Sequence, residues 1–271
     1  MTKKISTVLA ICFGFFTAQS QVADTTTYRL NKVKEVQSFV HFLGFERQDT
    51  CLFQVRNIDS FGKIEKDYIN YGCQGWNMTN TTHITYDSFH QIIKIRYDEN
   101  DEESSEMRFA YDELGRAVLE INQIWNPYST SITQYTYFGP LGREDSVYVL
   151  QIIDGDSSHF KTINSYKNDL LKKSETYEGA TGKIISMYTK KYDEQNRPVR
   201  TETYLFREDG RDAITNIVYD RNGRVGETND EVSELAAHFF YDENGLLALT
   251  HYFNRFGSLE REVWHKYLFY E

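Results

Sequence analysis

Hydrophobic and polar residues alternate along much of this chain with a period of two. One such run comprises Ile93, Lys94, Ile95, Arg96 and Tyr97, and another comprises Met107, Arg108, Phe109, Ala110 and Tyr111. The same alternation occurs in the segments 119–122 and 132–137. Side chains in a β-strand point alternately to the two faces of the sheet, so this period is typical of strands. The pattern therefore predicts a chain made of many short strands.

A tyrosine returns at gaps of 22 to 29 residues, at Tyr86, Tyr111, Tyr137, Tyr166, Tyr192, Tyr219, Tyr241 and Tyr270. Five of these tyrosines are followed directly by an aspartate, namely Asp87, Asp112, Asp193, Asp220 and Asp242. Self-similarity at such a period indicates that one small supersecondary unit is repeated along the chain.

The residue four places after the tyrosine is of a restricted kind: Gly115, Gly223, Gly245, Asn196 and His90. These residue types are enriched at positive φ, and an aspartate can accept hydrogen bonds from backbone N–H groups that follow it. The motif Tyr-Asp-x-x-Gly therefore predicts a tight turn between two strands. A degenerate copy occupies 58–63, the copy after Tyr137 is one residue longer, and the copy after Tyr166 has no glycine.

Each unit contains a second turn near its middle, predicted at 126–129, 179–182, 208–211 and 254–257. One unit is then two strands and two turns, and about eight units give an antiparallel meander of about 14–18 strands. The chain has only three prolines, which agrees with this prediction because proline cannot donate to a sheet ladder. The expected fold class is all-β.

The segments 111–116, 219–224 and 241–246 resemble the YD repeats of bacterial RHS proteins, wall-associated proteins and animal teneurins. The resemblance extends over about residues 55–271. It implies an extracellular or envelope location and an array of β-hairpins that curls into a shell. Because this chain has only about eight units, we expect a short member without a toxin domain, folded as a curved open sheet or partial shell.

The first twenty residues have the features of a secretory signal peptide. Lys3 and Lys4 precede the apolar stretch 8–16, and Ala18 and Ser20 supply small residues before the expected cleavage site after Ser20. Residues 21–271 are then expected to form a single domain. No other segment approaches the length of a transmembrane helix.

Residues 21–57 are less regular and are interpreted as an atypical capping segment. Within it, the stretch 32–43 fits either a strand or an amphipathic helix. As a strand it would pair with residues 51–55 and cap the array.

The chain is acidic, with a formal net charge of −10, which becomes −12 when the two lysines of the first twenty residues are removed. An acidic protein is poorly suited to nucleic acid, whose phosphates require a basic face. The balance suits a soluble periplasmic or secreted protein. The densest acidic run, 98–106, is expected to be a solvated hairpin tip, with weak calcium binding as the alternative.

Cys51 and Cys73 lie on either side of the turn at 58–63. In an oxidising compartment they are candidates for a disulfide, and two free thiols are the alternative.

A basic residue follows several of the turns, at Lys63, Arg116, Arg143, Arg197 and Arg224. Such residues are expected in solvent or in local pairs, with a ligand-binding row as the alternative. The recurrent tyrosines are expected to pack in a column, and an exposed aromatic strip for sugars or peptides is the other interpretation.

Nothing in the sequence predicts catalysis. The seven histidines form no zinc motif, and the chain has no nucleophile elbow, phosphate-binding loop or dinucleotide fingerprint. The predicted function is a non-catalytic binding or structural scaffold at the cell envelope, without a cofactor, whose partner is a protein or glycan. The alternatives are an envelope glycan-processing enzyme that uses dispersed carboxylates, or an accessory partner of a secreted toxin.

Overall fold

The structure, a computed structural model, describes residues 26–43, 50–125, 128–141, 143–206 and 212–271. The expected signal peptide, residues 1–20 with cleavage after Ser20, and the turn expected at 208–211 lie outside these ranges. The described chain is all-β apart from a helical turn at residues 26–30 and a short 3-10 helix, η1 (Tyr71–Gln74). No helix among the described residues is long and apolar enough to cross a membrane.

Eighteen strands follow one another along the chain and form one antiparallel sheet. Their bounds are β1 Val33–Phe42, β2 Cys51–Ile58, β3 Ile64–Asn70, β4 Thr79–Tyr86, β5 Ile92–Glu99, β6 Glu102–Tyr111, β7 Ala117–Trp125, β8 Tyr128–Phe138, β9 Ser146–Ile153, β10 Asp156–Lys167, β11 Leu170–Glu178, β12 Ile184–Tyr192, β13 Pro198–Leu205, β14 Ala213–Tyr219, β15 Val225–Asp230, β16 Leu235–Tyr241, β17 Leu247–Phe253 and β18 Leu259–Phe269. The expectation of an all-β antiparallel meander is confirmed.

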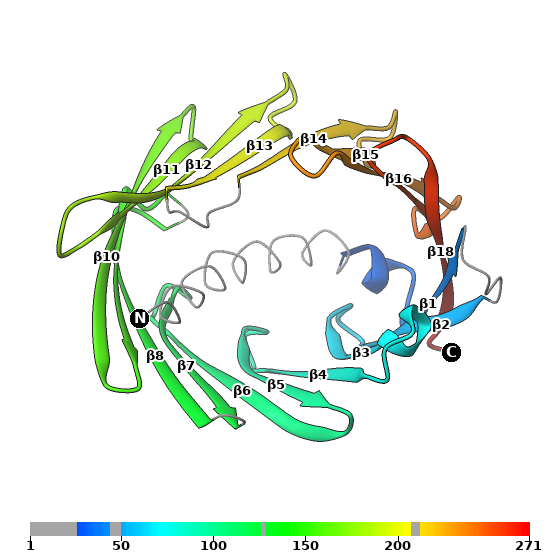
Figure 1. Cartoon of the computed structure of the whole chain (residues 1–271), viewed down its shortest axis with the longest axis horizontal. Coiled ribbons are helices and arrows are strands. Elements are labelled where there is room, and N and C mark those ends of the chain that lie inside the picture. The colour runs from blue at the N-terminus through cyan, green and yellow to red at the C-terminus, as the bar shows by residue number, and fades with distance from the viewer. Residues whose placement is uncertain (1–25, 44–49, 126–127, 142, 207–211) are drawn as a thin grey trace.

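The sheet closes on itself, and the expected open sheet or partial shell is therefore wrong. Strand β1 pairs with β2 on one side and with β18 on the other, and each of β2 to β17 pairs with its two neighbours in sequence. Figure 1 shows the resulting ring, in which the first and last strands lie side by side. An open sheet would leave the N–H and C=O groups of two edge strands unpaired, and closure removes both edges.

The closing strand comes from the segment that the sequence analysis assigned to a cap. Val40 lies opposite Val263 of β18 and opposite Cys51 of β2, so β1 is hydrogen-bonded along both sides. The stretch 32–43 is thus a strand that pairs with β2 as expected. It joins the two ends of the array instead of covering one of them.

The hairpins that carry the Tyr-Asp turns all lie at one end of the barrel. They join β2 to β3, β4 to β5 and each later even-numbered strand to the next odd-numbered one. Because consecutive strands are antiparallel, these connections share one end, which we call the YD rim. The connections from odd to even strands, including η1 and the turn at Asn254, form the opposite rim.

The two faces of each strand differ in exposure. In β8, Ser131, Thr133 and Tyr135 are buried, whereas Gln134 and Thr136, on either side of Tyr135, are exposed. The cross-strand register carries this alternation round the ring, and the buried set defines the inner face. On the outer face, charged side chains occupy positions in the middle of strands; Lys94, Arg108 and Lys191 are examples.

An apolar cluster fills the inside of the barrel near the YD rim. Tyr28 of the helical turn packs there with Val36, Ile58 and Leu246, and the helical turn at residues 26–30 lies inside the ring in Figure 1. The ring of Tyr28 also lies 6.4 Å from that of Tyr267, centre to centre. The segment before β1 therefore packs against the inner face beside the seam between β1 and β18.

Candidate functional site

The turn residues chosen from the sequence adopt the backbone conformation that the motif requires. The φ angles are +78° at Gly115, +80° at Gly223, +79° at Gly245 and +62° at Asn196. His90, which occupies the same slot, is also at +62°. The chain reverses direction at each of these positions, as the pattern predicted.

The aspartates organise the turns through their carboxylates. Oδ1 of Asp112 accepts hydrogen bonds from the backbone N–H groups of Leu114 and Arg116, at 3.0 and 2.8 Å. These backbone bonds, with the guanidinium of Arg116, hold the pKa of the Asp112 carboxyl below its usual range. The same pair of backbone bonds is made by Asp87, Asp193, Asp220 and Asp242.

Seven of the eight recurrent tyrosines donate a hydrogen bond to a residue that follows the preceding turn. The hydroxyl of Tyr137 donates to the carbonyl oxygen of Ala117 at 2.6 Å, and burial raises the pKa of Tyr137 to about 12. Equivalent bonds run from Tyr86, Tyr111, Tyr166, Tyr192, Tyr219 and Tyr241 to backbone carbonyls, at 2.5–3.1 Å. These tyrosines therefore pack between units, and they do not form an exposed strip.

The last member of this series is Tyr267, although the sequence analysis chose Tyr270. Tyr267 donates to the carbonyl oxygen of Leu247 at 2.7 Å, as its counterparts do. Tyr270 instead donates to the carbonyl oxygen of Ile58, at 2.6 Å, across the closure of the ring.

The basic residues after the turns are engaged within the barrel. Nε of Arg116 donates to Oδ2 of Asp112 at 2.8 Å, and its guanidinium lies over the ring of Tyr137 in the next unit. Similar stacking joins Lys63 to Tyr86, Arg143 to Tyr166, Arg197 to Tyr219 and Arg224 to Tyr241. Local pairing thus describes these side chains better than a ligand-binding row.

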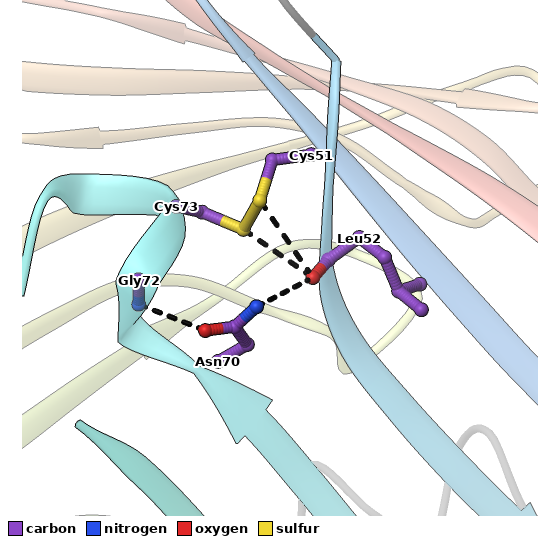
Figure 2. The surroundings of a disulfide bond; sticks show 5 residues. All are labelled: Cys51, Leu52, Asn70, Gly72 and Cys73. Carbon is purple, nitrogen blue, oxygen red and sulfur yellow. Dashed lines mark hydrogen bonds between the residues drawn. A yellow bond between two sulfur atoms is a disulfide. The ribbon is translucent and has the colours of Figure 1, made fainter. Parts of the chain in front are cut away.

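The structure joins Cys51 and Cys73 in a disulfide at the opposite rim. It links the first residue of β2 to η1, which follows β3. Figure 2 shows both sulfur atoms near the carbonyl oxygen of Leu52, to which Nδ2 of Asn70 donates at 3.5 Å. Oδ1 of Asn70 accepts from the N–H of Gly72 at 2.9 Å, so the bond lies beside a capped helical turn.

A cavity of about 210 Å³ lies on the inner face where β1, β2, β16, β17 and β18 meet. Its wall is largely apolar, with four aromatic rings, from Phe42, Phe53, Phe239 and Tyr252. Aliphatic side chains, including Val40, complete the apolar part. A concave, aromatic wall with a few polar groups is typical of a site for a small organic ligand.

Four nitrogen-bearing side chains line this cavity, from Gln54, Arg56, Arg261 and His265. The positive charge of Arg56 is paired with the carboxylate of Asp67, whose Oδ2 accepts a hydrogen bond from Nε of Arg56 at 3.2 Å. Arg261 lies over the ring of Tyr252, 4.3 Å from its centre. Within the described part of the chain, the buried Nε of Arg261 has no hydrogen-bond partner, and neither has Nε2 of His265.

His265 is held neutral by its surroundings. Burial, together with the nearby charge of Arg56, lowers the pKa of His265 to about 4. Its Nδ1 lies 3.0 Å from Oγ of Ser38, so Ser38 can donate to Nδ1 while a proton on Nε2 points elsewhere. A buried donor without a partner costs about 1–3 kcal/mol, and such a group calls for an explanation.

The contact between Ser38 and His265 also resembles a nucleophile and its base, but two observations oppose that role. Ser38 is only 2% exposed, which leaves its hydroxyl out of reach of a substrate. The other ring nitrogen of His265 has no partner among the described residues, whereas a catalytic histidine is oriented by a third group.

A carboxyl group faces the interior elsewhere. Glu120 of β7 lies opposite Phe109 and Thr133 on the inner face, and burial raises the pKa of its side chain. Its Oε2 accepts from the hydroxyl of Tyr135 at 3.1 Å. The partner of this acid is thus a phenol, and not a second carboxyl group.

The described residues contain no group of three or more histidine, cysteine, aspartate or glutamate side chains that could hold a metal ion. Sequence reasoning did not single out Arg56, Arg261 and His265. Alternation alone could have placed Arg261, Val263 and His265 on one face of a strand. Only the closed ring brings that face against β2.

No protein-family model and no curated protein matches this chain. Among solved structures, a porin-like protein from Bacteroides uniformis is similar, with a TM-score of 0.45 and 9% identity, over 87% of this chain and 98% of that one. A porin-like protein from Bacteroides vulgatus gives 0.39 and 14%, over the same shares.

A Tc holotoxin pore from Photorhabdus luminescens is also similar, with a TM-score of 0.34 and 11% identity, over 79% of this chain and only 12% of that one. All of these TM-scores are below 0.5. We therefore base no conclusion about function on these similarities.

Proposed function

We propose that this chain is a secreted or periplasmic, non-catalytic binding protein of the YD-repeat type. Its ligand would be a small organic anion with an apolar body, held in the cavity between β1, β2 and β16–β18. The proposed location rests on the leader-like first twenty residues and is supported by charged side chains on the outer face, such as Lys94 and Arg108.

One observation carries the ligand class: among the described residues, Arg261 presents a buried, unpartnered N–H donor in a cavity whose wall contains four aromatic rings. An anionic ligand oxygen would satisfy this donor, and hydrogen bonds to charged groups contribute about 1.5–3 kcal/mol. The aromatic rings would bury the apolar body of the ligand.

A neutral His265 fits the same ligand. With Nδ1 facing Ser38, Nε2 is available as a second donor to an anion. Asp67 does not oppose the ligand's charge strongly, because Arg56 and Gln54 already donate to it.

The competing hypothesis of a glycan-processing enzyme has less support. Glycoside hydrolysis ordinarily requires two carboxyl groups on either side of the scissile bond. The inner-face acid with a raised pKa, Glu120, is paired with Tyr135 instead. The hypothesis of a toxin accessory rests on the YD-repeat resemblance alone.

The test compares two fluorescent probes of similar shape, the anion 8-anilinonaphthalene-1-sulfonate and the uncharged N-phenyl-1-naphthylamine. We expect Arg261→Gln to weaken binding of the sulfonate about tenfold or more, since a charge-assisted bond is lost. Binding of the uncharged probe should change little.

The matched control is Arg255→Gln, which removes an exposed arginine that lies over Phe256 at the opposite rim. Thermal unfolding of each variant shows whether it remains folded. Equal affinity of the wild type and Arg261→Gln for the sulfonate would refute the proposal.

A further inference from the structure

The YD rim carries a row of exposed apolar side chains at the tips of four consecutive hairpins. Phe61, Phe89, Leu114 and Leu141 are 52%, 82%, 55% and 57% exposed, and we call this set the apolar arc. They stand in the turns that connect β2 to β3, β4 to β5, β6 to β7 and β8 to β9. Three of them occupy one slot of the turn, two residues after the aspartate, and Leu141 lies in the longer turn that follows Tyr137.

The arc covers only one half of the rim. In three later turns of the ring the same slot holds Gln195, Asn222 and Asn244. The backbone N–H at this slot binds the turn carboxylate whether the side chain is Leu114 or Asn222. Because the turn accepts polar residues equally well, its geometry does not explain four large apolar side chains in water.

The aspartates in the turns that carry the arc already accept hydrogen bonds from the backbone. Asp59 accepts from the N–H groups of Phe61 and Lys63, both at 2.8 Å, and Asp87 makes the same two bonds. Asp112 is paired in addition with Arg116. The acidic turn residues can therefore approach an apolar phase with their hydrogen bonds already made, which limits the penalty of desolvation.

The spacing of the tips favours a fluid phase over a folded partner. Neighbouring strands are about 4.8 Å apart, so successive tips are about 10 Å apart along the rim. The four apolar side chains are therefore separated from one another by polar turn residues such as Ser60, Ser88 and Glu113, although the ring of Phe61 also lies 4.2 Å from that of His90 in the next turn, centre to centre. A lipid interface accepts such separate side chains without matching pockets.

We propose that the apolar arc docks this barrel on the surface of a lipid bilayer, with Phe61, Phe89, Leu114 and Leu141 inserted among the headgroups. The net charge of −10 favours zwitterionic over anionic lipid. This docking is independent of the cavity, which lies where β1, β2 and β16–β18 meet.

The test is flotation of the full secreted protein with phosphatidylcholine vesicles. The double variant Phe89→Ser/Leu114→Ser should lower the vesicle-bound fraction at least tenfold. The matched control is Phe256→Ser, since Phe256 is 76% exposed in a turn with the same hydrogen-bond pattern at the opposite rim. This control should float as the wild type does.

Three results would overturn the proposal. The first is a bound fraction that the double variant leaves unchanged, and the second is an equal loss in Phe256→Ser. The third is a wild-type protein that does not bind vesicles but self-associates in sedimentation, while the double variant stays monomeric. This result would make the arc an interface between copies of the chain. The probe-binding assay on Arg261 is unaffected by any of these outcomes.

Discussion

The guanidinium carbon of Arg116 lies 4.9 Å from the centre of the Tyr137 ring, so the residue that ends one turn covers the tyrosine that begins the next. The same arginine donates to Asp112 of its own turn, and the tyrosine donates to the carbonyl oxygen of Ala117. Three side chains thus fasten each unit to its neighbour. Because every link joins adjacent units, the effect of removing one is expected to be local.

Replacement of Arg116 by glutamine should destabilise the barrel by about 1–2 kcal/mol, because a half-buried ion pair and a cation–π contact are lost together. Urea unfolding followed by circular dichroism measures the change. Arg255→Gln serves as the control, because Arg255 stacks on Phe256 in solvent and forms no ion pair with the described residues; this variant should stay within about 0.5 kcal/mol of the wild type. Equal losses in the two variants would contradict the role assigned to Arg116.

Gly223→Ala should cost about 1–2 kcal/mol, because φ is +80° at this position and a Cβ there is strained. Gly223→Asn should cost less, since Asn196 occupies the same slot at +62°. Gly226→Ala is the control, because Gly226 has no positive φ and an added Cβ would meet its nearest atom, the backbone nitrogen of Asp220, at 3.5 Å. Thermal unfolding that ranks Gly226→Ala as the worst of the three would be incompatible with this account.

Removal of the disulfide by Cys51→Ser/Cys73→Ser should lower the free energy of unfolding by about 3 kcal/mol, since the bond closes a loop with a sequence separation of 22. Chemical unfolding with and without a reductant measures this. The reductant should destabilise the wild type to the level of the double variant and leave the variant unchanged. A wild type that is insensitive to reductant would argue against the bond.

His265 should make the barrel less stable in mild acid. Its pKa is lowered from 6.5 to about 4 in the folded protein, so the unfolded chain takes up the proton first as the pH falls below 6.5. Between pH 7.5 and pH 5 this group should remove about 2 kcal/mol of stability.

Urea unfolding at the two pH values tests this prediction. His265→Gln should lose about 2 kcal/mol less than the wild type over the same interval. The control His159→Gln changes an exposed histidine and should lose as much as the wild type. Identical pH dependence in all three proteins would show that His265 is not held neutral.

The turns could be predicted from the sequence because their physics is local. A residue at positive φ, such as Gly115, and a carboxylate that binds N–H groups two and four residues ahead, such as that of Asp112, interact within one short segment. The alternation of side chains along a strand is equally local, and both features survive in the fold.

The same local pattern misled where a contact joins distant parts of the chain. Tyr270 fits the spacing of the series, but its hydroxyl donates to Ile58 near the other end of the chain, and the bond of the series is made by Tyr267. Glu120 alternates with apolar residues that the pattern suggests as core, but its register with Phe109 and Thr133 turns it inward.

The sequence by itself therefore determined the strands, their turns and the order in which neighbouring strands pair, since these depend on residues close together in the chain. Only the tertiary structure decided that β1 pairs with β18 as well as β2, because the pairing of Val40 with Val263 joins segments from opposite ends of the chain. The same closure sets Arg56 beside His265 and so creates the cavity. The pairing of β1 with β18 cannot be predicted from local propensity, because it depends on the accumulated curvature of all eighteen strands.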